Sequence, residues 1–101
     1  MRAALGLLLA VAAATAWAQD ARALQARSLA ASCAACHGTL GHGVDNATVP
    51  PLAGQPAAQT VELFKAFRSG ARSGSVMPQI AKGYSDAQIE AIAGLLAQEK
   101  P

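Results

Sequence analysis

Both cysteines of this chain lie in one five-residue stretch, CAACH, which runs from Cys33 to His37. Two cysteines at this spacing, followed at once by a histidine, can form a disulfide, hold a metal ion or tether a cofactor. A staple of some kind is needed, because a domain of this size buries only about 60% of the surface of its unfolded chain. The chemistry of this stretch therefore decides what the chain can fold around.

The first 18 residues are interpreted as a signal peptide. Arg2 gives a positive start, residues 5–16 are apolar, and Ala16-Trp17-Ala18 matches the small-x-small pattern of a cleavage site. The apolar run is shorter than the roughly 20 residues of a membrane-spanning helix, and no positive flank follows it. We expect cleavage after Ala18, export to the periplasm and no membrane span in the mature chain. A retained membrane anchor is the less favoured alternative.

The remaining residues, 19–101, are long enough for one domain. Their core is poor in large side chains, because alanine dominates and the aromatic residues after Trp17 are Phe64, Phe67 and Tyr84. Without Arg2, seven basic side chains face six acidic ones, a balance too even and too dispersed to indicate nucleic-acid binding. A bound apolar group would supply the missing core volume.

Two alternatives for the cysteines fit the surrounding sequence poorly. A redox-active disulfide of the thioredoxin type is expected to open a helix after a strand, whereas an alanine-rich helical segment precedes Cys33. A zinc site would need His42 as a fourth ligand. Zinc ligands usually come as two separated pairs, and the adjacent Cys36 and His37 do not easily share one tetrahedron.

The remaining interpretation is covalent attachment of haem, for which C-x-x-C-H is the specific motif. The thiols of Cys33 and Cys36 would form thioether bonds to the two vinyl groups of haem, and His37 would bind the iron as its proximal ligand. A large, flat, apolar group also suits the thin core. We therefore predict one haem c, tethered through Cys33 and Cys36.

An electron-transfer haem needs a second axial ligand, usually Met or His. After cleavage Met77 is the one remaining methionine, and it stands in a glycine-flanked stretch, SGSVMPQIAKGYSD, that is expected to form a loop. His42 is the rival, but it follows His37 too closely to pass around the edge of the ring. The sequence therefore favours His37 and Met77 as the two iron ligands.

Helices are expected on both sides of these residues. Residues 21–34 contain strong helix formers and no Gly or Pro, so a helix should run into the first cysteine. The stretch PAAQTVELFKAFRSG predicts a second helix over about 56–70, ended by its glycine. A third helix should begin after Ser85, which forms an S-x-x-Q capping box with Gln88. The chain is therefore predicted to be all-α.

From about Ser28 to Leu96 the chain resembles the small bacterial class I cytochromes c. The similarity is particularly close to the cytochrome subunit of flavocytochrome c sulfide dehydrogenases, in the stretches CAACHGT, PPLAGQPAA, FRSGAR and MPQIAKGYSDAQIEAIA. The resemblance implies a class I cytochrome c fold, with three to five helices around one haem in a domain spanning 19–101. It also implies thioether bonds to both cysteines and axial ligation by His37 and Met77.

The resemblance gives the proline segment a role as well. Pro50 would offer its carbonyl to the second ring nitrogen of His37, a hydrogen bond that fixes the orientation of a ligating histidine. The Pro50-Pro51 pair restricts its segment to an extended path, which suits a fixed acceptor. Leu52 would pack on the haem ring.

Together these residues predict one-electron transfer between Fe(III) and Fe(II) rather than enzymatic turnover. The chain would be a freely diffusing periplasmic carrier or the electron-accepting subunit of a sulfide-oxidising flavoprotein. Its single CxxCH, where several such subunits carry two, leaves the partner open. A haem-based gas or redox sensor with a displaceable Met77 is the alternative. Four basic residues are candidates for a docking rim or for pairing with the haem propionates, and the alternative is an ordinary solvated face. They are Lys65, Arg68, Arg72 and Lys82.

Overall fold

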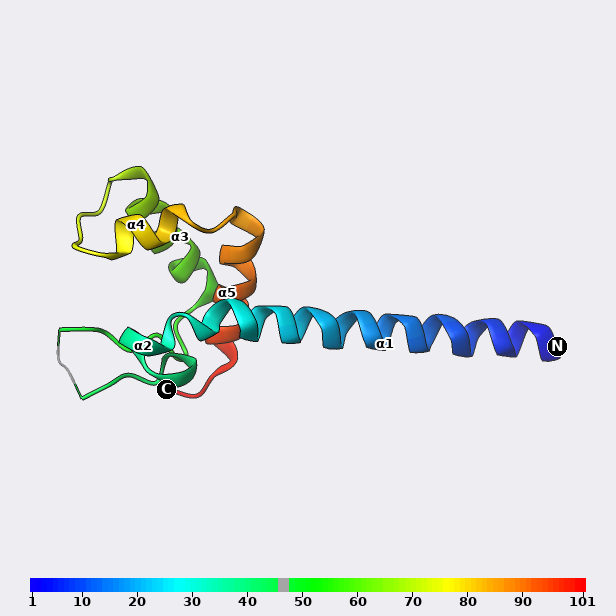
Figure 1. Ribbon diagram of the computed structural model, residues 1–101. Coiled ribbons are helices and arrows are strands. Elements are labelled where there is room, and N and C mark those ends of the chain that lie inside the picture. The colour runs from blue at the N-terminus through cyan, green and yellow to red at the C-terminus, as the bar shows by residue number, and fades with distance from the viewer. Residues whose placement is uncertain (46–47) are drawn as a thin grey trace.

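The structure, a computed structural model, describes residues 1–45 and 48–101, which form helices and loops without a strand (Figure 1). The predicted all-α architecture is confirmed for this part of the chain. In chain order the elements are α1 (Arg2–Ala31), α2 (Ala34–His37), the 3₁₀ turn η1 (Thr39–Gly41), α3 (Ala57–Ser69), α4 (Met77–Lys82) and α5 (Asp86–Gln98).

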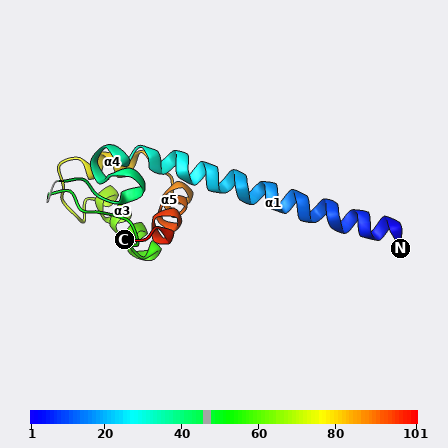
Figure 2. The ribbon, with the colours of Figure 1, turned by 90° about the horizontal axis from the view of Figure 1, so that it is seen from below.

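Helix α1 extends far beyond the rest of the molecule, as Figures 1 and 2 show. Its residues up to Gln25 are all exposed, and the radius of gyration of the chain is 17.5 Å, against about 13 Å for a compact chain of this length. Among the described residues, α1 is the one helix long and apolar enough to cross a membrane. A signal sequence near the N-terminus passes the same test.

The helix predicted over 21–34 differs from the structure at both ends. It begins much earlier, because the preceding Ala- and Leu-rich residues are themselves strong helix formers. It ends at Ala31, where the Cys33 N–H donates to the Ala30 carbonyl (3.0 Å) in a tighter turn. A separate short helix, α2, then carries the second cysteine and His37.

Two clusters of buried side chains hold the helices together. The first lies where the end of α1 packs on α5 and contains Ala30, Ile92 and Leu96. The second lies between α3, α4 and α5 and contains Phe64, Ala81 and Ile89. Tyr84, in the short link between α4 and α5, packs against both clusters. Each fully buried Ile or Leu contributes about 1.5–3 kcal/mol, so these few residues account for much of the packing.

The predicted ends of the later helices are confirmed. Helix α3 begins after Pro56 and ends at Ser69, with Gly70 as its C-cap residue, as its sequence indicates. At the start of α5 the Gln88 N–H donates to Ser85 Oγ (3.2 Å), and the Ser85 N–H donates to Gln88 Oε1 (2.9 Å). The capping box is therefore formed in both directions.

The prediction of a loop around Met77 is wrong, because Met77 is the first residue of helix α4. Pro78 follows it, and proline is tolerated in the first turn of a helix, where its missing N–H has no intrahelical partner. Ala81, fully buried beside Phe64, fixes this helix in the core. Within the predicted stretch, non-helical chain remains before α4, in residues 73–76, which are all exposed, and after it, in residues 83–85.

Candidate functional site

Helix α2 places both cysteines and His37 within a single turn. Cys33 precedes the helix as its N-cap residue, and its carbonyl accepts the His37 N–H (2.9 Å). Residues three apart on a helix lie on the same face, so the two sulfurs point to one side. Both thiols are free, Cys33 half-buried and Cys36 exposed. This arrangement can present two thiols to one edge of a flat ligand.

The environment of Cys33 differs from that of a redox-active cysteine. Burial raises the pKa of the Cys33 thiol; its hydrogen bond with the Ser32 side chain acts in the opposite direction, and the neighbouring Cys36 adds to the rise. Reactive C-x-x-C pairs instead lower the pKa of one thiol so that a thiolate forms. The Cys33 site therefore favours a neutral thiol.

His37 is oriented by the main chain of the proline segment. Its Nδ1 lies 2.7 Å from the Pro50 carbonyl oxygen. A carbonyl only accepts hydrogen bonds, so Nδ1 must carry the proton, and Nε2 of the neutral ring keeps a free lone pair. A histidine held in this way presents Nε2 to a metal in a fixed direction. The hydrogen bond implied by the family resemblance is thus present in the structure.

A short hydrogen-bonded loop positions the Pro50 carbonyl. After α2 the chain turns back, and the Gly43 N–H donates to the His37 carbonyl (2.7 Å). The Gly41 carbonyl then accepts N–H groups from Leu52 (2.7 Å) and Ala53 (3.0 Å). These bonds tie the segment that follows Pro50 to the loop that follows His37.

Leu52 links this loop to the core. It is partly buried and packs on the cluster formed by Ala30, Ile92 and Leu96. Its expected contact with a haem ring remains a prediction.

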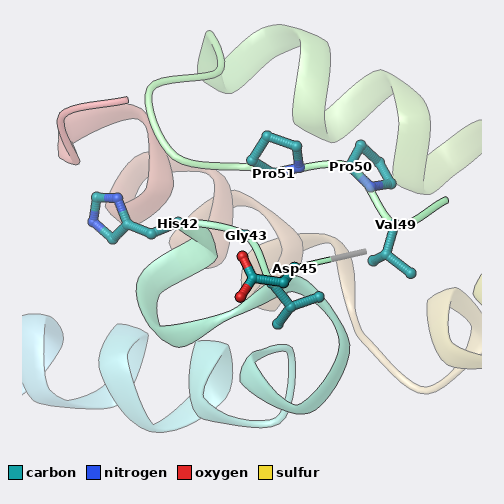
Figure 3. Close-up of a pocket in the computed structure, with 7 residues that line it drawn as sticks. His42, Gly43, Asp45, Val49, Pro50 and Pro51 are labelled. Carbon is teal, nitrogen blue, oxygen red and sulfur yellow. The ribbon is translucent and has the colours of Figure 1, made fainter. Parts of the chain in front are cut away.

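A hollow of about 510 Å³ lies beside the loop, between the run after His42 and the proline segment (Figure 3). The His42 ring is set apart from the prolines in this view, and its Nε2 lies 3.4 Å from a carboxylate oxygen of Glu99, near the end of the chain. His42 is therefore engaged with the C-terminal segment. The residues that line the hollow are His42, Gly43, Val44, Asp45, Val49, Pro50 and Pro51.

Met77 lies in α4, which packs on α3, away from the contact between α1 and α5. It is partly buried and packs on the cluster formed by Phe64, Ala81 and Ile89. In Figure 1, α2 and α4 both lie on the side of α5 away from the protruding part of α1. The structure thus brings Cys33, Cys36, His37 and Pro50 together through local and loop contacts, and it positions Met77 through a separate helix.

The donor set fits haem c better than a metal ion held by protein alone. Two free thiols, an oriented imidazole and a partly buried thioether are the groups that bind haem c and its iron. Residues 1–45 and 48–101 bring together no group of three His, Cys, Asp or Glu side chains that could hold a metal ion. Few apolar side chains form the core, so a bound haem would also add apolar packing to it.

Two of the four basic residues have partners within the domain. Arg68 donates to the Asp86 carboxylate (2.6 Å), and the Arg72 guanidinium lies 5.3 Å from the centre of the Phe67 ring. Lys65 and Lys82 are exposed. The two arginines are thus engaged in contacts around α3, and a docking or propionate-binding role for any of the four residues remains a prediction.

Sequence reasoning missed one long-range contact next to the cysteines. The Ser32 hydroxyl lies 2.6 Å from the Tyr84 hydroxyl, 52 residues away. Neither residue type nor spacing signals this pair, because it depends on how the end of α1 meets the link between α4 and α5.

Comparison with known proteins places this geometry in a family. Residues 19–96 match the family model described as cytochrome c oxidase, cbb3-type, subunit III. A thiosulfate dehydrogenase electron acceptor from Thiomonas intermedia is 41% identical over 84% of this chain and 39% of its own length. Cytochrome c-554(548) from Halomonas halodenitrificans is 38% identical over 68% of this chain and 86% of its own.

The cytochrome subunit of sulfide dehydrogenase from Chlorobaculum tepidum is 35% identical over 64% of this chain and 57% of its own length. Reduced cytochrome c4 from Pseudomonas stutzeri superposes with a TM-score of 0.72 at 31% identity, over 80% of this chain and 50% of that one. The chain thus spans less than half the length of the thiosulfate dehydrogenase acceptor. It belongs to the cbb3-type subunit III family of cytochromes c and has a class I cytochrome c fold.

Proposed function

We propose that this chain transfers single electrons through one haem c, bound covalently through Cys33 and Cys36 and ligated axially by His37 and Met77. The observation that carries the proposal is the 2.7 Å hydrogen bond between His37 Nδ1 and the Pro50 carbonyl. It orients the imidazole directly beside two free thiols on one helical turn. Membership of a cytochrome c family supports the same cofactor.

Each residue has a distinct task in this proposal. The two thiols hold the group in place, so that the iron can change charge without a change of position. The Pro50 carbonyl accepts a hydrogen bond from Nδ1–H of His37, which makes Nε2 a more basic ligand for the iron. When bound, haem c supplies the one-electron Fe(III)/Fe(II) couple, and a neutral Met ligand raises its potential. The chain is an electron-transfer protein, and the chemistry of any substrate belongs to its partner.

The partner we propose is a dehydrogenase that oxidises a reduced sulfur compound. Relatives named as a thiosulfate dehydrogenase electron acceptor and as a cytochrome subunit of sulfide dehydrogenase support it. A flavoprotein is one such partner. A freely diffusing carrier is the other version, and cytochrome c-554(548), 86% of whose length this chain matches, is a relative whose name mentions no dehydrogenase. Redox encounters of this type use small interfaces, below about 1,200 Å².

Residues 1–18 are proposed to be a signal peptide that directs the domain to the periplasm. The exposed first part of α1 supports this, because the described domain gains no buried residue of α1 before Ala30. The mass of the mature protein from an export-competent host tests it. A chain that starts at Gln19 is expected, and a mass that includes residues 1–18 would instead support a retained anchor.

The haem proposal is tested by absorption spectroscopy on protein matured in an export-competent host. A reduced-minus-oxidised spectrum of haem c is expected, with the weak near-infrared band that methionine ligation gives ferric haem. Met77→Ala should lose this band and allow the reduced protein to bind carbon monoxide. His42→Ala is the matched control and should keep the band, because its side chain contacts Glu99.

The alternatives give different results in the same experiment. Carbon monoxide binding by the unaltered reduced protein would favour a sensor with a displaceable Met77. The absence of covalent haem in the exported protein would overturn the proposal and return the two cysteines to disulfide or zinc chemistry.

A further inference from the structure

Next to the site, a hydrogen bond between side chains joins the end of α1 to the link between α4 and α5. The Ser32 hydroxyl lies 2.6 Å from the Tyr84 hydroxyl. Ser32 is the residue before Cys33, and Tyr84 comes two residues after the end of α4, the helix that begins at Met77. The contact therefore connects the cysteine-bearing end of α1 with the segment that carries Met77.

Tyr84 is held at three points. Its ring packs edge-on against Phe64, with ring centres 6.1 Å apart and planes at 83°. Its main-chain carbonyl accepts a hydrogen bond from Arg68 (3.5 Å), and Arg68 also pairs with Asp86 (2.6 Å). Its hydroxyl meets Ser32. Tyr84 also packs on both buried clusters. It therefore links the position of α1 and α5 to that of α3 and α4.

Helix α4 packs on α3 and leads at its C-terminal end into Tyr84. The residues before it, 69–76, are all exposed, so few side chains hold Met77 from the N-terminal side. Within the helix, Ala81 is fully buried. The helix ends at Lys82, and its C-cap Gly83 (φ −80°, ψ −6°) stays in the right-handed helical region, directly before Tyr84. Met77 and Tyr84 are thus expected to move together when α4 moves.

We propose that Ser32 and Tyr84 form a positioning contact that keeps Met77 at the iron and restricts the access of outside ligands. This rests on the proposed function, in which Met77 is the axial ligand. In this proposal α4 moves when Met77 leaves the iron, and Tyr84, which follows the other end of α4, moves with it and away from Ser32. The hydrogen bond therefore opposes release. Neither residue touches the iron; both act through Met77.

The test is an imidazole titration of the ferric holoprotein, followed through the loss of the near-infrared methionine band. Tyr84→Phe removes the hydroxyl and keeps the ring that packs on Phe64. We expect imidazole to bind about two- to twelve-fold more tightly to this variant, which corresponds to the loss of one hydrogen bond that opposes opening. Ser32→Ala, a change at an exposed residue, should give a similar shift.

The double variant and a matched control define the contact further. Ser32→Ala with Tyr84→Phe should bind imidazole no more tightly than the stronger single variant, because both remove the same hydrogen bond. Ser69→Ala is the control. The Ser69 hydroxyl bonds the carbonyl three residues earlier (Ala66, 3.2 Å), as the Ser32 hydroxyl does with Leu29 (3.2 Å), so Ser69→Ala should leave the affinity unchanged.

The outcomes separate this proposal from the proposed function. If the unaltered protein lacks the methionine band, Met77 ligation fails and this proposal fails with it. If the band is present but Tyr84→Phe and Ser32→Ala leave imidazole affinity unchanged, Tyr84 serves only the stability of the fold, and the positioning role alone is overturned. Fully additive shifts in the double variant would overturn it as well.

Discussion

Replacement of Gly38 by alanine should destabilise the protein through the loop that follows the CAACH stretch. Gly38 has φ +83° and ψ 160°, a region that is essentially restricted to glycine and costs another residue about 1–3 kcal/mol. A Cβ there would also collide with the main chain of Gly43. The backbone must then shift and weaken the 2.7 Å bond from the Gly43 N–H to the His37 carbonyl, a further loss of about 0.5–1.5 kcal/mol.

The expected total for Gly38→Ala is about 1.5–4.5 kcal/mol of unfolding free energy. Denaturant unfolding of the holoproteins, followed by circular dichroism and by haem absorbance, measures it. Gly94→Ala is the matched control, because no neighbouring atom lies within 4 Å of its new Cβ and alanine is favoured in a helix interior by about 1 kcal/mol. If Gly38→Ala were as stable as the unaltered protein, the inferred strain and collision would be refuted.

Two further predictions concern α5. Ile92 is fully buried against Ala30 and Leu96, so Ile92→Ala should lower the unfolding free energy by about 2–5 kcal/mol, and a smaller loss in denaturant unfolding would show that the cluster repacks. The hydrogen bond and charge of Arg68 hold the pKa of Asp86 below its ordinary value. Asp86 therefore stabilises the fold above its unfolded pKa, and this contribution is lost as pH falls through its folded pKa. Thermal unfolding of Asp86→Asn and of the unaltered protein should accordingly converge in acid, and a difference that persists there would contradict the pairing.

Local features of the chain could be predicted from neighbouring residues. The capping box at Ser85 and Gln88 and the end of α3 at Gly70 formed as expected, because each depends on side-chain and backbone groups within one helical turn. The CAACH stretch likewise specifies its own spacing of sulfurs and imidazole. Helix α4 was not predicted, because its proline and the flanking glycines are typical of a loop. Burial of Ala81 in the core stabilises a helix there instead.

The contacts that orient the site were decided by tertiary structure. Chemistry alone required some acceptor for the second nitrogen of His37, and the family resemblance pointed to Pro50, but the 2.7 Å contact exists because the Gly41 carbonyl holds the following segment in place. His42, a rival ligand by composition, is drawn to Glu99 by the path of the C-terminal segment.

The sequence by itself determined the kind of cofactor site, because the thiols and the imidazole that make it are covalent neighbours and need only one helical turn to meet. The position of Met77 relative to them was decided by packing. Ser32 and Tyr84 are 52 residues apart, and their hydroxyls meet because the end of α1 packs on α5 while α4 packs on α3. The free energy of such a contact depends on burial and geometry at both ends, which no local pattern of residues encodes.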